Sequence, residues 1–168
     1  MGASKATGGS GDTGSVHSFR NSLLWQRSQD LAVDVIAVSR LVRKDDAGRS
    51  VIRQLIASAG SVAANIAEGH GRYSVAAYRN HLSIARGSVA ETESWIDLLH
   101  RSGYIDAATE RPLVQECEAI IAALTSAMRR LEARLNEGKP GLIREETAEY
   151  GLYHGEVAEA EPPDFAMP

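Results

Sequence analysis

The chain has 168 residues, which suits one domain with short terminal segments, and its low aromatic content of 5% favours packed helices over a sheet. Its net charge of −4 is unevenly placed: residues 20–136 hold 15 Arg and Lys against 13 Asp and Glu, and residues 137–168 hold 2 against 8. No stretch reaches the roughly 18 to 20 apolar residues of a membrane span, and the single Cys117 excludes an internal disulfide, so we expect a cytoplasmic protein.

Residues 1–19 are rich in Gly and Ser and lack the apolar run of a signal peptide, so we expect a disordered tail. Apolar residues then recur every three, four or seven positions, which predicts a first helix with one buried face. That face comprises Leu24, Leu31, Val35, Val38 and Val42. Ser18 or Ser22 can cap its start, and the break at residues 45–48 supplies the cap of the next helix.

A second helix is predicted after this break, with an apolar face that runs from Val51 to Ile66 at the same spacing. We expect it to stop at Gly69 in the left-handed conformation that glycine adopts easily. Ser74 should cap a third helix, which ends near Gly103. Asp106 should cap a fourth that runs to Leu135, and Pro112 implies either a later start or a local kink.

Four helices with short connections predict an all-α, antiparallel up-down-up-down four-helix bundle over residues 20–136. We expect the acidic residues 137–168 to be largely disordered. The second predicted helix is apolar over more than one face and rich in small residues, so it should be buried on two sides. It would then lie at the bundle centre or in a subunit interface, which favours a homo-oligomer.

Polar residues follow the apolar part of the second helix. Asn65 and Glu68 share one helix face, and Arg72 can reach back to Glu68 or to Glu91. We interpret this group as a clamp at the corner between the second and third helices, with Asn65 bonding free carbonyls at the helix end. A phosphate site is less favoured here, because a helix C-terminus repels anions.

The sequence carries no clear catalytic or metal motif. Glu91 and Glu93 are two apart, so on a helix they point to different sides and cannot converge on one substrate. The five histidines show neither zinc spacing nor the Glu-x-x-His motif of di-iron bundles, and Cys117 lies on an apolar face as a core thiol. We expect no enzyme, metal or cofactor; a ligand site would require Glu68, Arg72 and Glu91 to converge on a pocket.

Arginines are the candidates for binding nucleic acid. Arg72, Arg79 and Arg86 are spaced by seven along one side of the third helix, and Arg49 and Arg53 are four apart on the second. A further group near the end of the fourth helix comprises Arg129, Arg130 and Arg134. In one subunit such residues are usually solvated, but repeated around a ring they could line a positive surface for phosphates.

Two segments resemble a known four-helix-bundle family: LWQRSQDLAVDV and QLIASAGSVAANIAEGHGRYSVAAYRNHLSIARGSVAETESWIDLLHRSGYI. That family includes proteins encoded in intervening sequences of bacterial large-subunit ribosomal RNA genes. It is also similar to accessory variability proteins of diversity-generating retroelements. The resemblance covers residues 24–135, and the residues that match the family pattern imply a shared architecture. They are Asn65, Glu68, Gly69, Arg72, Gly87, Ser88 and Glu91.

The resemblance implies a homopentameric ring, and for the retroelement branch it implies binding to a reverse transcriptase and to RNA or DNA. We therefore expect a non-catalytic oligomeric scaffold that binds nucleic acid, a reverse transcriptase, or both, as an accessory protein. The alternative is a purely protein-binding structural bundle. Asn65, Glu68, Gly69, Arg72, Ser88 and Glu91 are expected to form the structural corner in either case.

Overall fold

Four long helices and one short 3-10 helix lie within residues 18–137, the part of the chain that our computed structural model describes. The elements are η1 (Phe19–Asn21), α1 (Leu23–Ser39), α2 (Asp46–His70), α3 (Val75–Arg101) and α4 (Ala107–Asn136). The disorder expected for residues 1–17 and 138–168 lies outside the described residues. Phe19, which we had assigned to the N-terminal tail, instead forms η1, because its ring packs edge-on against Trp25 at 5.2 Å.

Each α-helix begins at a side chain that accepts a hydrogen bond from an early backbone N–H, as the sequence predicts. Asp45 accepts from Gly48 at 2.8 Å, and Asp106 accepts from Thr109 at the same distance. Ser74 caps α3. The two candidate serines of the first helix are both used, since Ser18 caps η1 and Ser22 caps α1.

The ends of the helices differ from the prediction at two places. Gly69 does not terminate α2 in a left-handed conformation, because the helix continues through His70 and Gly71 forms the cap with φ −77°. Positive φ belongs instead to Gly103, after α3, at +71°. The later start considered for the fourth helix is wrong as well: α4 begins at Ala107 and Pro112 lies inside it.

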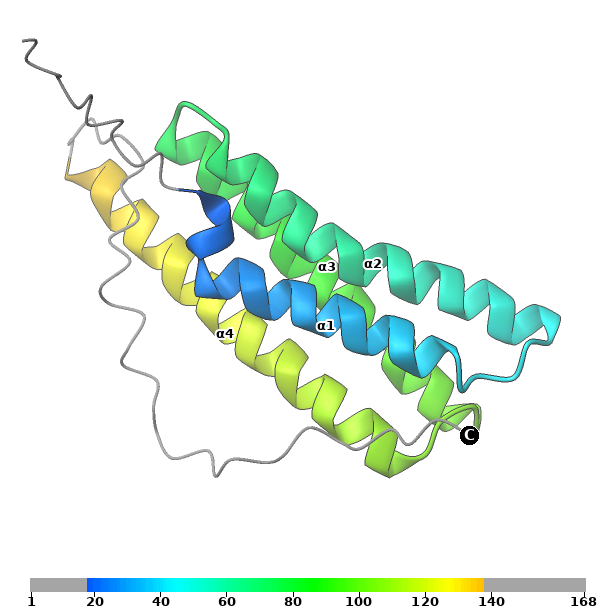
Figure 1. Cartoon of the computed structure of the whole chain (residues 1–168). Helices are drawn as coiled ribbons and strands as arrows, with labels where there is room; N and C mark the ends of the chain where they lie inside the picture. The colour runs from blue at the N-terminus through cyan, green and yellow to red at the C-terminus, as the bar shows by residue number, and fades with distance from the viewer. Residues whose placement is uncertain (1–17, 138–168) are drawn as a thin grey trace, which may run out of the picture.

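The helices pack as an antiparallel bundle in which α1 contacts both α2 and α4, and α3 contacts α2 and α4 (Figure 1). The predicted apolar faces form the core. Its largest fully buried residues include Leu31, Leu55, Leu82, Ile96, Ile120 and Leu124. Val42 is buried too, although it lies beyond the end of α1. The all-α four-helix bundle is thus confirmed for a single chain.

Two ends of the bundle can be distinguished in Figure 1. At one end lie η1, the α2–α3 loop and the last turn of α4; at the other lie the α1–α2 and α3–α4 loops. Polar contacts join α1 to α4, α2 to α3 and α3 to α4. Between α1 and α4, Arg27 and Glu116 form a two-point ion pair, with N–O distances of 2.8 and 2.6 Å. Within residues 18–137, no helix has the length and hydropathy to cross a membrane.

Candidate nucleic-acid interface

The corner between α2 and α3 contains the predicted clamp in part. Arg72 forms an ion pair with Glu68, and its Nε donates a hydrogen bond of 3.1 Å to Nε2 of His81. Because Nε2 accepts, the imidazole carries its proton on Nδ1, which is buried and has no partner among the described residues. The expected pairing of Arg72 with Glu68 is confirmed. The alternative with Glu91 is wrong, since Glu91 accepts from Trp95 Nε1 at 3.2 Å farther along α3.

Gly69 belongs to this corner for a reason that differs from the prediction. A Cβ at this position would lie 2.7 Å from Cβ of His81 and 2.8 Å from Cδ2 of Tyr78. Atoms this close cannot be accommodated without movement of α3. Glycine at position 69 therefore lets the two helices approach closely, and the turn itself is made by Gly71.

Asn65 and Ser88 form a second, separate group midway between the bundle ends. Asn65 donates from Nδ2 to the Ser61 carbonyl at 2.8 Å and to its hydroxyl at 3.0 Å, and Ser88 donates to that hydroxyl at 3.1 Å. A neighbouring buried contact joins Thr92 to Ser58 at 3.0 Å. The prediction that Asn65 bonds free carbonyls at the helix end is wrong. Asn65 lies a full turn inside α2 and reaches back to residue 61. The predicted six-residue corner is thus two clusters, and Glu91 belongs to neither.

The structure does not bring the five candidate arginines together. Arg49 and Arg53 lie near the start of α2, whereas Arg72, Arg79 and Arg86 lie in the opposite half of the bundle. Arg72 also precedes α3, so it does not lie along the side of that helix as predicted. Three of the five are occupied by carboxylates: Arg49 by Asp46, Arg72 by Glu68 and Arg79 by Glu132. Within the described chain, Arg53 and Arg86 form no ion pair and are exposed.

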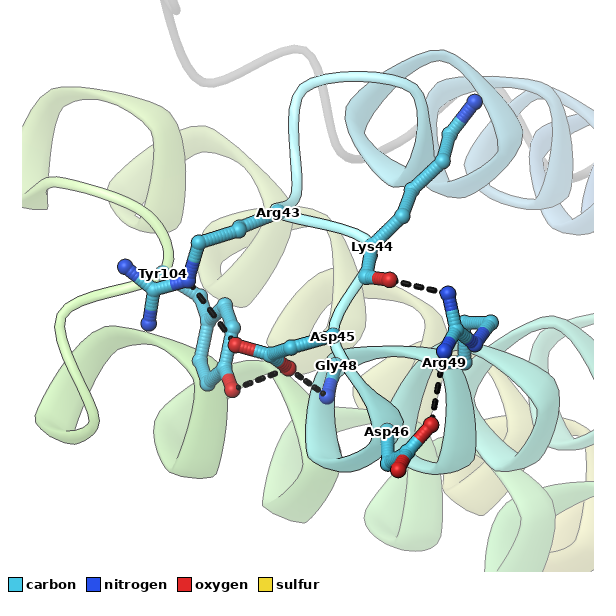
Figure 2. Close-up of polar contacts among 7 residues, drawn as sticks. All are labelled: Arg43, Lys44, Asp45, Asp46, Gly48, Arg49 and Tyr104. Atoms are coloured by element: carbon cyan, nitrogen blue, oxygen red, sulfur yellow. Dashed lines mark hydrogen bonds and ion pairs between the residues drawn. The ribbon is translucent and has the colours of Figure 1, made fainter.

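A polar cluster that sequence reasoning missed joins the two loops at the other end (Figure 2). Asp45 Oδ1 accepts from the Tyr104 hydroxyl at 2.7 Å, and Oδ2 accepts from Arg43 Nε at 2.8 Å. The Arg43 guanidinium also lies over the Tyr104 ring, 5.0 Å from its centroid. The backbone N–H of Gly48, together with Arg43 and Tyr104, lowers the pKa of Asp45 to about 2. Such a carboxylate is suited to holding two loops together and is too weak a base for proton transfer near neutral pH.

Charge separates along the length of the bundle. We define the basic half as residues 18–30, 59–87 and 122–137, the half of each helix nearest η1 and the α2–α3 loop. It holds eight arginines against four acidic residues, Asp30, Glu68, Glu132 and Glu137. One of the eight, Arg27, is neutralised by Glu116, which lies just outside residues 122–137. The remainder of the described chain holds seven Arg and Lys against ten Asp and Glu. The weak net charge of the bundle therefore combines a positive half and a negative half.

The arginines of the basic half differ in whether they already have an acidic partner. Arg20 lies over two aromatic rings, 5.4 Å from the centroid of Phe19 and 5.9 Å from that of Trp25. Among the described residues Arg20, Arg86, Arg129 and Arg134 have no acidic partner. These side chains are available to an external anion, which is the electrostatic requirement of a phosphate-binding surface.

The groups proposed for a ligand site do not converge. Glu68 and Arg72 pair with each other, and Glu91 lies farther along α3. Burial raises the pKa of the Cys117 thiol to about 12, in agreement with the core thiol predicted for this position. Over residues 18–137, no group of three or more His, Cys, Asp and Glu side chains is arranged to hold a metal ion.

Comparisons with known proteins identify a family model and solved structures that are similar to this chain. Residues 20–126 match the family model described as 23S rRNA-intervening sequence protein. A crystal structure of a protein of unknown function from the S23 ribosomal protein family of Bacteroides thetaiotaomicron VPI-5482 superposes with a TM-score of 0.60. It is 26% identical and covers 64% of this chain and 99% of its own. No curated protein matches the chain.

Proposed function

This chain belongs to the 23S rRNA-intervening sequence protein family, and from that premise we propose that it is a non-catalytic, homo-oligomeric bundle that binds nucleic acid through its basic half. The proposal includes a role as an accessory protein, in which the bound nucleic acid, a partner enzyme such as a reverse transcriptase, or both are held on the surface of a ring. A pentamer is the assembly that the family resemblance favours.

The observation that carries the proposal is the separation of charge along the bundle. Phosphate binding depends on local charge, and the basic half has twice as many arginines as acidic residues. Three of the five arginines first expected to bind nucleic acid, Arg72, Arg79 and Arg86, lie in this half. The exposed Arg129 on α4 adds a cation that no described carboxylate neutralises.

Self-association is supported by two glycines on exposed helix surface. A Cβ added at Gly60 of α2 or at Gly87 of α3 would meet no atom within 4 Å. Glycine inside a helix costs about 0.5–1 kcal/mol relative to alanine, and nothing within the described chain offsets that cost. Close approach of another subunit would do so. The surface of α2 around Gly60 is also uncharged, since residues 54–67 contain no Asp, Glu, Lys or Arg.

A ring of several subunits would repeat the basic half around one axis. Each copy contributes only a modest excess of positive charge, but simultaneous contacts from linked copies raise the overall affinity for one strand. The proposal therefore connects the two properties: assembly supplies the charge density that a single chain lacks.

The proposal is tested by binding of labelled 20-nucleotide RNA and DNA to the full chain, followed by fluorescence anisotropy at 50 and 200 mM salt. We expect binding at 50 mM that weakens with salt, and a smaller salt dependence for the double variant Arg86→Gln/Arg129→Gln. The slope of log K against log salt should fall by about 0.7 per lost contact on a single strand. The matched control is Arg53→Gln/Arg111→Gln, two exposed arginines in the other half, which should bind like the unmodified chain. No binding at 50 mM would contradict the proposal.

A second candidate is the purely protein-binding bundle. It is favoured by the ion pairs that already occupy Arg49, Arg72 and Arg79, because paired arginines bind phosphate less readily. A reverse transcriptase retained by the purified protein after nuclease treatment, together with absence of nucleic-acid binding, would support this candidate. Light scattering gives the subunit number in both cases.

A further inference from the structure

Tyr73 is the most exposed large apolar side chain of the described residues. Its relative accessibility is 106%, whereas the other exposed large apolar residues range from 37% to 60%. It makes no hydrogen bond, ion pair or ring contact within residues 18–137. A whole aromatic ring in water is unfavourable, and the packing of this bundle does not explain it.

The exposure of Tyr73 does not result from a loose loop. On one side, Gly71 caps α2, and the N–H of Arg72 donates to the Gly69 carbonyl at 3.0 Å. On the other side, Ser74 caps α3 through a bond to Ala77. These bonds fix the backbone on both sides of Tyr73, which places the residue at the tip of the bundle.

Arginines lie at the same end of the bundle as this loop. Arg72 precedes Tyr73 directly and is held by Glu68 and His81. Arg20 belongs to η1, which lies against the end of α2 because the Phe19 ring contacts His70 at 6.4 Å. Figure 1 shows the α2–α3 loop, η1 and the last turn of α4, which carries Arg134, at this same end.

We propose that this end of the bundle binds single-stranded nucleic acid, with Tyr73 stacking on one unpaired base and Arg20 and Arg134, which have no acidic partner among the described residues, contacting the phosphates on either side of it. The proposal rests on the nucleic-acid binding proposed above and names the form of nucleic acid and the tip that reads it. An aromatic platform beside cations is the usual arrangement of single-strand sites, because each base presents a π-face once it is unstacked.

A duplex does not fit the same arrangement. Its bases are stacked on one another, so a single ring projecting from a loop cannot reach a base face along the helix. A duplex can still contact the arginines through its phosphates. The tip should therefore add affinity for single strands without adding affinity for duplexes.

The inference is tested with the full chain, a labelled 20-nucleotide single strand of RNA or DNA, and a blunt 20-base-pair duplex, all at 50 mM salt. Tyr73→Ala should weaken binding of the single strand about 5- to 150-fold, the usual effect of removing one stacked base. Tyr73→Phe, which keeps the ring, should bind within about twofold of the unmodified chain. Leu41→Ala, an exposed apolar residue at the opposite end, is the matched control and should change nothing.

The outcomes separate the inference from the function on which it rests. Equal single-strand binding by Tyr73→Ala and the unmodified chain overturns the stacking role. If Arg86→Gln/Arg129→Gln still weakens binding in that case, the proposed nucleic-acid function stands without the stacking role. An equal loss of single-strand and duplex binding in Tyr73→Ala also overturns it. If the unmodified chain binds neither probe, both the inference and the proposed function fail. Because the Tyr73 side chain is fully exposed within residues 18–137, both Tyr73 variants should keep the melting temperature of the unmodified chain.

Discussion

The Tyr104 hydroxyl donates a hydrogen bond of 2.7 Å to Oδ1 of Asp45, a residue 59 positions earlier in the chain. Asp45 caps α2, so this bond joins the loop after α3 to the start of α2. Arg43 covers the tyrosine ring and pairs with the other carboxylate oxygen. The two loops at this end of the bundle are thus fastened through one carboxylate.

Tyr104→Phe should lower the free energy of unfolding by about 1 kcal/mol, since it removes one hydrogen bond and leaves the ring and its contact with Arg43 in place. Urea denaturation measures the change. The control is Tyr73→Phe, which removes a hydroxyl that bonds to nothing in the described chain and should leave the urea midpoint unchanged. Equal midpoints for both variants would show that the Asp45 contact contributes no stability.

Lowering the pH should decrease the free energy of unfolding by protonating Asp45. Its pKa is lowered to about 2 in the folded chain, below the ordinary value of about 3.9 in an unfolded one. The stabilisation is therefore fully present above about pH 4 and is lost as the pH falls towards 2. Asp45→Asn retains a capping side chain but cannot titrate. Urea midpoints at pH 5 and pH 2.5 should differ less in this variant than in the unmodified chain, and an equal difference would contradict the assignment.

Gly69→Ala should destabilise the bundle by about 1–3 kcal/mol, the usual effect of overpacking, because the added methyl collides with Tyr78 and His81. Gly71→Ala is the matched control two residues away. Its Cβ would meet only the Glu68 carbonyl, at 3.4 Å, and its φ of −77° suits alanine. Thermal melting compares the two. A larger loss for Gly71→Ala than for Gly69→Ala would reverse the roles given to these glycines.

The variants Gly60→Ala and Gly87→Ala distinguish a monomeric chain from an oligomer. In an isolated chain both should be stabilising by about 0.5–1 kcal/mol, since alanine favours the helix and meets no neighbour. If another subunit packs closely on these positions, the added methyl groups should instead weaken association. Light scattering over a range of concentrations, combined with melting curves, measures both effects. We expect weaker association, and stabilisation without a change in mass would place the interface elsewhere.

The Cys117 thiol should resist alkylation in the folded protein. Burial raises its pKa to about 12, so the reactive thiolate is scarce at pH 8, and the sulfur is inaccessible as well. Iodoacetamide labelling followed by mass spectrometry should be slow in buffer and rapid in denaturing urea. Fast labelling in buffer would mean that the α4 core face opens readily.

The helices could be predicted from the sequence because burial itself sets the spacing of residues such as Leu31, Leu82 and Ile120. The caps Ser74 and Asp106 could be predicted for a local reason too, since each bonds a backbone N–H three residues ahead. The bond between Tyr104 and Asp45 depends on which loops meet at one end, so no local pattern could have revealed it. The same limit applies to Gly69, whose role depends on side chains of another helix.

The candidate site was predicted less well than the fold. Spacing alone suggested that Arg72, Arg79 and Arg86 form a line, but Arg72 lies in a loop. The pairing of Arg79 with Glu132 depends on the packing of α3 against α4, so no local pattern reveals it. The prediction that Asn65 bonds carbonyls at the helix end depends on α2 stopping at Gly69. Because α2 continues through His70, both predictions are wrong. The basic half emerges only when alternate helices are reversed, which places the starts of α1 and α3 beside the ends of α2 and α4.

The ion pair between Arg27 and Glu116 spans 89 positions of sequence, far more than any turn of this bundle. Adjacent helices can meet after only a short segment is ordered, but α1 and α4 can meet only after everything between them has been arranged. Because the entropic cost of closure rises with the length of chain enclosed, the contact between α1 and α4 should form last during folding. The contact between α1 and α4 should also be lost first during unfolding, and the α2–α3 hairpin should be the part that remains folded.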